Sequence, residues 1–183
     1  MSDELIISQC SPTLAGIKTG SLFSCRIESK EDVIRQIRYL NKLLGRKGIR
    51  IIPLRFRKNS ALIYVYRPSK LKKDISDGEV MQILKKYGYT SEAPEKCICH
   101  LINRIRDLDD FPHEIGLFLG YPLEDVCGFI EHNAKDEKLV GYWKVYGDEH
   151  EAQKLFDMYR KCTEDYLKRI RAGNSIEKLT VAV

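Results

Sequence analysis

The sequence predicts an α+β protein: a small, mostly antiparallel sheet with helices packed on it, followed by a helix-rich second half. Two runs, residues 49–57 and 61–67, alternate apolar and polar side chains with the period of two that half-buried strands show. After residue 77 the apolar residues recur mainly every three or four positions, as in amphipathic helices. With 43% hydrophobic and 31% charged residues, the composition is that of an ordinary globular protein.

The length favours a single domain over residues 1–183. Charge divides it into a basic N-terminal lobe, about residues 1–73, and an acidic, helix-rich part, about residues 74–183. No apolar run reaches the roughly 20 residues of a membrane-spanning helix, and Met1–Glu4 is acidic where a signal peptide is basic. We therefore expect a cytoplasmic protein with no membrane partner, in which the six cysteines stay reduced.

The N-terminal segment is expected to alternate strands and helices. The apolar run Leu5–Ile7 predicts a short strand, and Ser11-Pro12 is typical of a helix start. Residues 21–28 predict a second strand. Ser29 then resembles the first residue of a capping box, and the helix after it, residues 33–44, carries its apolar residues on one stripe.

The two alternating runs form a hairpin if Lys58-Asn59 is a two-residue turn. Arg57 then lies opposite Ser60, and Arg55 lies opposite Leu62. The face assigned to the core carries Ile52, Leu54, Phe56, Ala61, Ile63 and Val65. The opposite face carries Arg55, Arg57, Tyr64 and Tyr66.

The remaining elements are predicted from caps, apolar stripes and glycines. Helices are expected after Asp77, after Pro94, on both sides of Gly120, and from Asp148 to about Ala172. The helix after Pro94 has Cys97, Leu101, Ile105 and Leu108 at core spacing. Strands are expected at residues 142–146 and 179–183.

Positive charge is concentrated in one segment. From Val33 to Lys73 the chain has 13 Lys and Arg residues and no Asp or Glu, whereas the remainder has 18 basic and 26 acidic residues. Such a segment attracts phosphate or carboxylate groups unless it is only a solvated face or is neutralised by the acidic half. We assign the anion to Arg55 and Arg57, with Tyr64 and Tyr66 stacking on the ligand or hydrogen-bonding to it.

Four segments together point to a family: Cys10–Lys18, Leu62–Arg67, Phe111–Pro122 and Tyr142–Gly147. In them the chain resembles the domain of unknown function 3793 family of anaerobic Gram-positive bacteria, over nearly its whole length. The resemblance implies no activity, ligand or catalytic residue. It implies only a loose association with flavodoxin-type and iron-handling genes, and so with redox or iron-related physiology.

Cys10 is one candidate catalytic residue. If a helix starts at Ser11-Pro12, its unpaired amides favour the thiolate, and Lys18, a candidate ligand-binding residue, adds positive charge. The alternative is a small buried residue with no chemistry.

His113 is the other candidate, since an imidazole near neutrality can act as a general acid or base. The alternative is a structural role at a helix start with Glu114. Residues 115–126 also fit the packing of a helix-turn-helix, with a small residue at Gly116, a turn glycine at Gly120 and the apolar Val126, but its acidic second helix disfavours DNA reading. Cys97, Cys99 and His100 do not converge on one ion from a helix, so no metal site is assigned.

The leading hypothesis is a protein that binds an anionic small molecule or cofactor of undetermined identity at the Arg/Tyr face. One alternative is a single-stranded nucleic-acid-binding module that uses the same face. Another is an interaction protein that docks an acidic, flavodoxin-like partner. The oligomeric state and any catalytic activity are left open.

Overall fold

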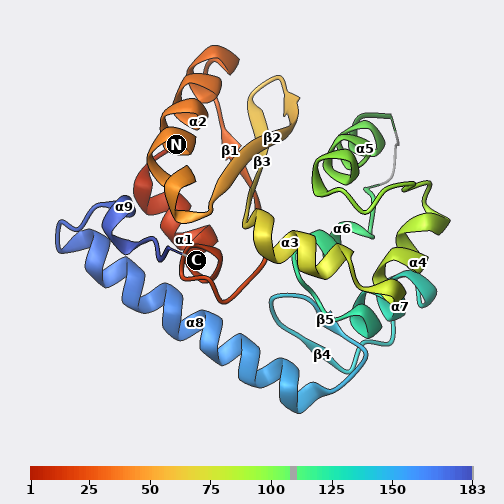
Figure 1. The fold of residues 1–183 in the computed structure, drawn as a ribbon. Helices are drawn as coiled ribbons and strands as arrows, with labels where there is room; N and C mark the ends of the chain where they lie inside the picture. The colour runs from red at the N-terminus through yellow and green to blue at the C-terminus, as the bar shows by residue number, and fades with distance from the viewer. Residues whose placement is uncertain (108–110, 183) are drawn as a thin grey trace. The chain divides into compact units, whose positions relative to one another are not determined.

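The computed structural model describes residues 1–107 and 111–182, and it divides the chain into two compact units (Figure 1). The first unit is Met1–Leu71 with Cys162–Val183, and the second unit is Lys72–Lys161. The first boundary lies close to the predicted change of charge near residue 73. The sequence pattern does not reveal that the C-terminal residues return to the first unit. The single-domain organisation stays a prediction.

The first unit is built on a three-stranded antiparallel sheet with the order β1-β3-β2. Its elements are α1 (Asp3–Leu14), β1 (Gly20–Arg26), α2 (Lys30–Leu44), the 3-10 helix η1 (Gly45–Lys47), β2 (Arg50–Arg57), β3 (Ser60–Tyr66), the beginning of α3 (Pro68–Ile75), the end of α8 (Glu149–Arg171), and α9 (Ile176–Leu179). The predicted strand, capped helix and hairpin between residues 21 and 67 are confirmed.

The hairpin register is confirmed at the turn but changes further along. Arg57 pairs with Ser60 and Arg55 pairs with Leu62, as expected. A bulge between Pro53 and Arg55 then shifts the alternation by one residue. Ile51, which is 1% exposed, therefore lies in the core where Ile52 was predicted. The assignment of Ile52 and Leu54 to the same face as Phe56 is wrong, because one extra residue moves a side chain to the other face. Leu54, at the bulge, is nevertheless buried, as predicted.

One face of this sheet is covered by α1 and α2 (Figure 1). Apolar residues of both helices form one buried cluster with Phe23, Ile63 and Val65 of the sheet. Tyr166 of α8 and the two buried apolar residues of α9 belong to the same cluster. This is the core that positions the first unit's strands.

The N-terminal prediction is wrong, because residues 3–14 form one helix. Ser2 is its N-cap: its side chain accepts a hydrogen bond from the Leu5 amide, and Asp3 and Glu4 suit the positive end of the helix dipole. Pro12 lies inside the helix rather than at its start, which places Cys10 well within it.

The second unit is helical apart from one small hairpin. Its elements are the end of α3, α4 (Gly78–Lys86), α5 (Pro94–Asp107), α6 (Ile115–Phe118), α7 (Leu123–Glu131), β4 (Leu139–Val140), β5 (Lys144–Val145) and the beginning of α8. The predicted helices are present, and the strand expected at residues 142–146 is β5. Leu108 lies outside the described residues.

The C-terminal strand is not formed: Ile176–Leu179 is a short helix, with Ser175 as its N-cap. The described C-terminal residues are tied back by hydrogen bonds, including one from the Val181 amide to the Leu14 carbonyl. The α+β class with a helix-rich second half is confirmed. Within the described residues, no helix combines the length and the apolar character needed to cross a membrane.

Candidate functional site

The candidate site is a hollow in the second unit, which we call the aromatic pocket. Its volume is about 320 Å³. Among the described residues, aromatic and aliphatic side chains form most of its wall, with two glycines and three polar residues. The lining residues are Phe111, His113, Ile115, Gly116, Tyr121, Asp125, Val126, Phe129, Val140, Gly141, Trp143 and Lys144.

The helices α6 and α7 form one side of the pocket. Gly120 makes the turn between them with a φ of +74°, a conformation that favours glycine. Gly116 approaches Val126 so closely that a Cβ at residue 116 would lie 2.7 Å from a Val126 methyl group. The two-helix packing unit expected around Gly120 is therefore present, and Gly116 and Val126 are where the two helices meet.

The β4–β5 hairpin forms another side through Trp143. The Tyr121 ring stacks on the Trp143 ring with their centroids 4.8 Å apart, and the Phe156 ring meets Trp143 edge to face at 4.6 Å. A Cβ at Gly141 would overlap the Phe156 ring, so only glycine fits there. This wall is a packed aromatic surface.

Asp125 joins the two sides. Its carboxylate is 3% exposed and accepts hydrogen bonds from the Trp143 indole at 2.6 Å, the Tyr146 amide at 2.7 Å and the Gly147 amide at 2.8 Å. A buried carboxylate is tolerated when such donors surround it. Asp125 thus holds the hairpin, and the indole, against α7.

Lys144 contributes its alkyl chain to the wall and uses its ammonium group elsewhere. The Nζ atom donates to the Ala134 carbonyl at 2.7 Å and to the Glu137 carboxylate at 3.0 Å. Because of these contacts, two of the pocket's three polar residues are already engaged by the protein itself.

His113 is the third polar residue, and it is exposed. Its ring meets the Phe129 ring edge to face, with the centroids 4.9 Å apart. The structure therefore places the predicted catalytic candidate at the pocket, with an imidazole that solvent or a ligand can reach.

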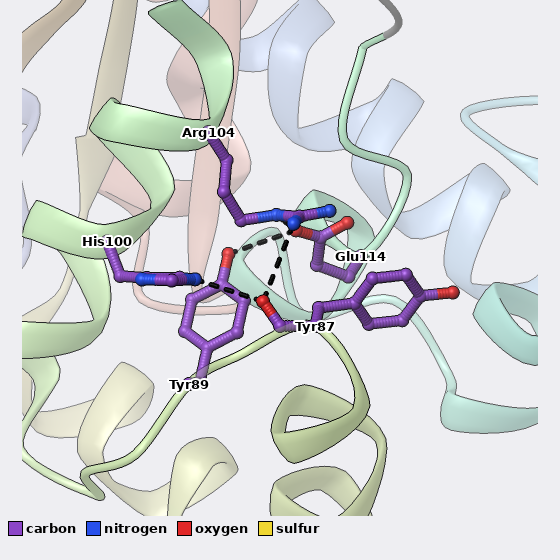
Figure 2. Close-up of polar contacts among 5 residues, drawn as sticks. All are labelled: Tyr87, Tyr89, His100, Arg104 and Glu114. Carbon is purple, nitrogen blue, oxygen red and sulfur yellow. Dashed lines mark hydrogen bonds and ion pairs between the residues drawn. The ribbon is translucent and has the colours of Figure 1, made fainter. Parts of the chain in front are cut away.

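The neighbouring Glu114 is buried in a separate polar network, which Figure 2 shows. Its carboxylate forms an ion pair with Arg104 at 2.5 Å and accepts a hydrogen bond from the Tyr89 hydroxyl at 3.1 Å. Burial and the Glu114 charge both raise the pKa of Tyr89. His100 and Arg104 also reach the Tyr87 carbonyl. The network anchors the residue next to His113 to α5, so Glu114 serves structure.

The arrangement is suited to burying a small planar molecule. Aromatic walls bury planar molecules, and a few polar groups fix their orientation. Over the described residues, 1–107 and 111–182, no three His, Cys, Asp or Glu side chains gather as metal ligands do.

A comparison with known protein families shows which family the chain belongs to. A family model described as a protein of unknown function, DUF3793, matches residues 6–180. The chain belongs to the DUF3793 family. No curated protein and no solved structure matched it. The resemblance stated from the four sequence segments is thereby confirmed.

In this DUF3793 protein, Cys10 is not at a helix start, so the argument for a thiolate fails. The Cys10 side chain is completely buried, and burial raises the pKa of its thiol to about 12. Lys18 is 8% exposed, and burial lowers the pKa of its ammonium group to about 8. The two charges influence each other's pKa, and Ser21 hydrogen-bonds Cys10. The structure brings Cys10 and Lys18 together inside the first unit.

The predicted Arg/Tyr face of the DUF3793 protein exists but is not uniformly accessible. Arg57 is exposed and Arg55 is half-buried, and both line a small depression. Tyr64 and Tyr66 lie further along the same face, and their rings stack at 4.8 Å. They are 0% and 8% exposed, so the expectation that they contact a ligand is not supported by their position.

Sequence reasoning missed most of the aromatic pocket. It selected His113, but not Asp125, Trp143, Tyr121 or Phe129. Trp143 is the chain's single tryptophan, and it lies in a segment with Tyr142 and Tyr146. That density of aromatic residues is the signal that was available.

Proposed function

We propose that this protein binds a small planar, predominantly apolar molecule of one or two rings in the aromatic pocket. The observation that carries the proposal is the stack of Tyr121 on Trp143 in the wall of a 320 Å³ hollow. Small-molecule sites are concave, mainly apolar and largely preformed, with few polar groups. Here the Asp125 and Lys144 side chains make hydrogen bonds within the protein, which leaves an apolar wall.

The polar group of the ligand is expected to meet His113. The imidazole is exposed at the pocket and is steered by its edge-to-face contact with Phe129. A hydroxyl, ring nitrogen or carboxylate on the ligand can hydrogen-bond to it, because a histidine ring offers both a donor and an acceptor. An acid-base role for His113 would act on this same group.

Trp143 provides a direct measurement, because it is the chain's single tryptophan and it lines the pocket. Quinoline and naphthalene-2-carboxylate are titrated while tryptophan fluorescence is recorded, and ligand-observed NMR extends the search to other one- and two-ring fragments. We expect saturable quenching. Removal of one aromatic contact in Phe129→Ala should weaken binding about tenfold, the size expected for a lost ring contact.

A matched control separates the pocket from the rest of the second unit. Met158 is 40% exposed on α8 and does not line the pocket, so Met158→Ala should bind as the wild type does. His113→Ala should weaken naphthalene-2-carboxylate more than naphthalene. Fragments that bind equally to the wild type and Phe129→Ala, or no binding from the whole set, would show that the pocket is not a ligand site.

A further inference from the structure

We infer that the first unit carries a separate site for the phosphate group of a small molecule, formed by Arg26, Arg55 and Arg57 with two serine hydroxyls. This site is independent of the aromatic pocket and of its ligand. It places the predicted anion binding at one end of the sheet and adds Arg26, which lies outside the carboxylate-free segment.

The strand register brings these side chains to one face. Ser60 on the central strand β3 lies between Arg26 on β1 and Arg57 on β2. In the next row on the same face, Leu62 lies between Ser24 and Arg55. Side chains at opposed positions project from the same side of a sheet, and those two residues apart do so as well. Three guanidinium groups and two hydroxyls therefore start from neighbouring positions.

A depression lies among these side chains. It has a volume of about 70 Å³ and is lined by Ser24, Arg55, Arg57, Ser60 and Leu62. By the same measure it is about a fifth of the 320 Å³ aromatic pocket, so it suits one tetrahedral anion and not a ring system. Arginine forks and serine hydroxyls are the side chains that hold phosphate oxygens in proteins.

The charge around the depression favours an anion. Two strands of the sheet, β2 and β3, and the turn between them belong to the segment from Val33 to Lys73, which has no Asp or Glu. Among the residues of the site, Arg26 has acidic neighbours, since it lines another hollow together with Glu28 and Asp32. It is paired with Ser60 but does not line the depression, so it is a flanking cation of the phosphate site.

The same face argues against a single-stranded nucleic acid. Proteins that follow a single strand stack its bases on exposed aromatic rings beside a basic groove. The tyrosines of this face, Tyr64 and Tyr66, are buried and stack on each other. The depression itself is lined by two arginines, two serines and Leu62, a set that can recognise a phosphate group but has no aromatic ring to stack on a base.

Inorganic pyrophosphate is the probe, titrated by calorimetry into the full-length protein at low salt. The wild type should bind it with a Kd near or below about 1 mM, and the Arg55→Gln, Arg57→Gln double variant should weaken binding at least tenfold. Arg26→Gln, as the flanking position, should weaken it less. Arg38→Gln removes an exposed arginine of α2, outside the depression, and should bind as the wild type does.

Three results would overturn the inference. The first is no pyrophosphate binding by the wild type at about 10 mM, far above the expected Kd. The second is an equal loss of pyrophosphate affinity in Arg38→Gln, which would mean that the affinity depends on the net charge of the protein alone. The third concerns a single-stranded dT20 oligonucleotide. If it binds much more tightly than pyrophosphate, with log K falling by several units per tenfold rise in salt, the face follows an extended strand.

Discussion

The indole N–H of Trp143 donates to the Asp125 carboxylate at 2.6 Å, and both side chains are almost completely buried. The other carboxylate oxygen accepts the amides of Tyr146 and Gly147, so one side chain at the first turn of α7 fixes the hairpin at three points. The position of the Trp143 ring in the aromatic pocket follows from this carboxylate. Stability of the second unit and the shape of its pocket are thus coupled.

Asp125→Ala should lower the free energy of unfolding by about 3–5 kcal/mol, because it leaves one buried and two partly buried donors without their acceptor. Asp125→Asn keeps an acceptor oxygen and the shape of the side chain, so it should cost less. Urea unfolding followed by the fluorescence of Trp143 measures both effects and reports the environment of the indole directly.

The control is the preceding residue, which is also acidic but exposed. Glu124→Ala should change stability by less than about 0.5 kcal/mol, as most exposed substitutions do. If Asp125→Ala were as mild as Glu124→Ala, the hydrogen bonds of Asp125 would not hold the hairpin.

These two neighbours show where sequence reasoning about the site stops. Glu124 and Asp125 both suit the first turn of a helix, where the dipole favours negative charge, and nothing in their local pattern separates them. What separates them is tertiary: Asp125 is buried by the three hydrogen bonds it accepts from residues 143–147, whereas Glu124 lies close to Gly147 but stays exposed. His113 could be selected from the sequence because the Phe-Pro-His-Glu motif is local. The aromatic wall of the pocket could not be predicted, because its residues come from separate segments of the chain.

A second relationship concerns Arg67, whose side chain is fully buried in the first unit and donates hydrogen bonds to four backbone carbonyls. Its guanidinium donates to the carbonyls of Thr13 and Leu14 at the end of α1, each at 2.7 Å, and to those of Lys47 and Val181. Carbonyls at a helix end have no partner within the helix, so this arginine satisfies them. It also ties the C-terminal residues to α1.

Arg67→Met should therefore lower the free energy of unfolding by about 3 kcal/mol or more, since charged hydrogen bonds to four carbonyls are lost. Arg67→Lys should recover little of this, because a single ammonium nitrogen cannot span the positions that the guanidinium fork reaches. Hydrogen exchange at the Val181 amide, which donates to Leu14, should accelerate in both variants.

The control for this prediction is Arg169→Met, which removes an arginine that is 60% exposed and paired with Asp165 on the same face of α8. It should have little effect, because exposed ion pairs contribute little to stability. Full rescue by Arg67→Lys would mean that only the positive charge matters at this position.

The fold shows the same division between local and tertiary information. The capped helix α2 and the turn of the hairpin were predictable, because Ser29 and the alternating runs are local signals. The prediction at residues 3–14 is wrong because Pro12 outweighs Ser2 and the acidic first turn as a local signal. Proline disfavours a helix interior, but the packing of the buried residues of α1 overrides that local preference. The bulge at residues 53–55 has no turn residue to mark it, and it changed which isoleucine enters the core.

The buried pair Cys10 and Lys18 makes stability depend on pH in two opposite ways. The pKa of Lys18 is about 8 in the folded protein and 10.5 ordinarily, so between these values only the unfolded chain keeps the proton. Stability then rises as pH rises, because the unfolded state binds more protons. The pKa of Cys10 is raised from 9.0 to about 12, so above pH 9 the unfolded thiol ionises first and stability falls. Below pH 9 the titration of Lys18 therefore dominates the contribution of this pair to the pH dependence of stability.

Lys18→Met should remove that rise. In the wild type, Lys18 should add about 1 kcal/mol to the free energy of unfolding between about pH 7 and pH 9, since one pKa unit corresponds to about 1.4 kcal/mol. The variant should lack this increment and should be more stable than the wild type at pH 7, where burying the ammonium group costs most. Urea unfolding at both pH values measures the difference, and Lys178→Met, at an exposed position on α9, should keep the wild-type slope. If the wild type and Lys18→Met change in parallel between the two pH values, the lysine is protonated in the folded protein throughout this range.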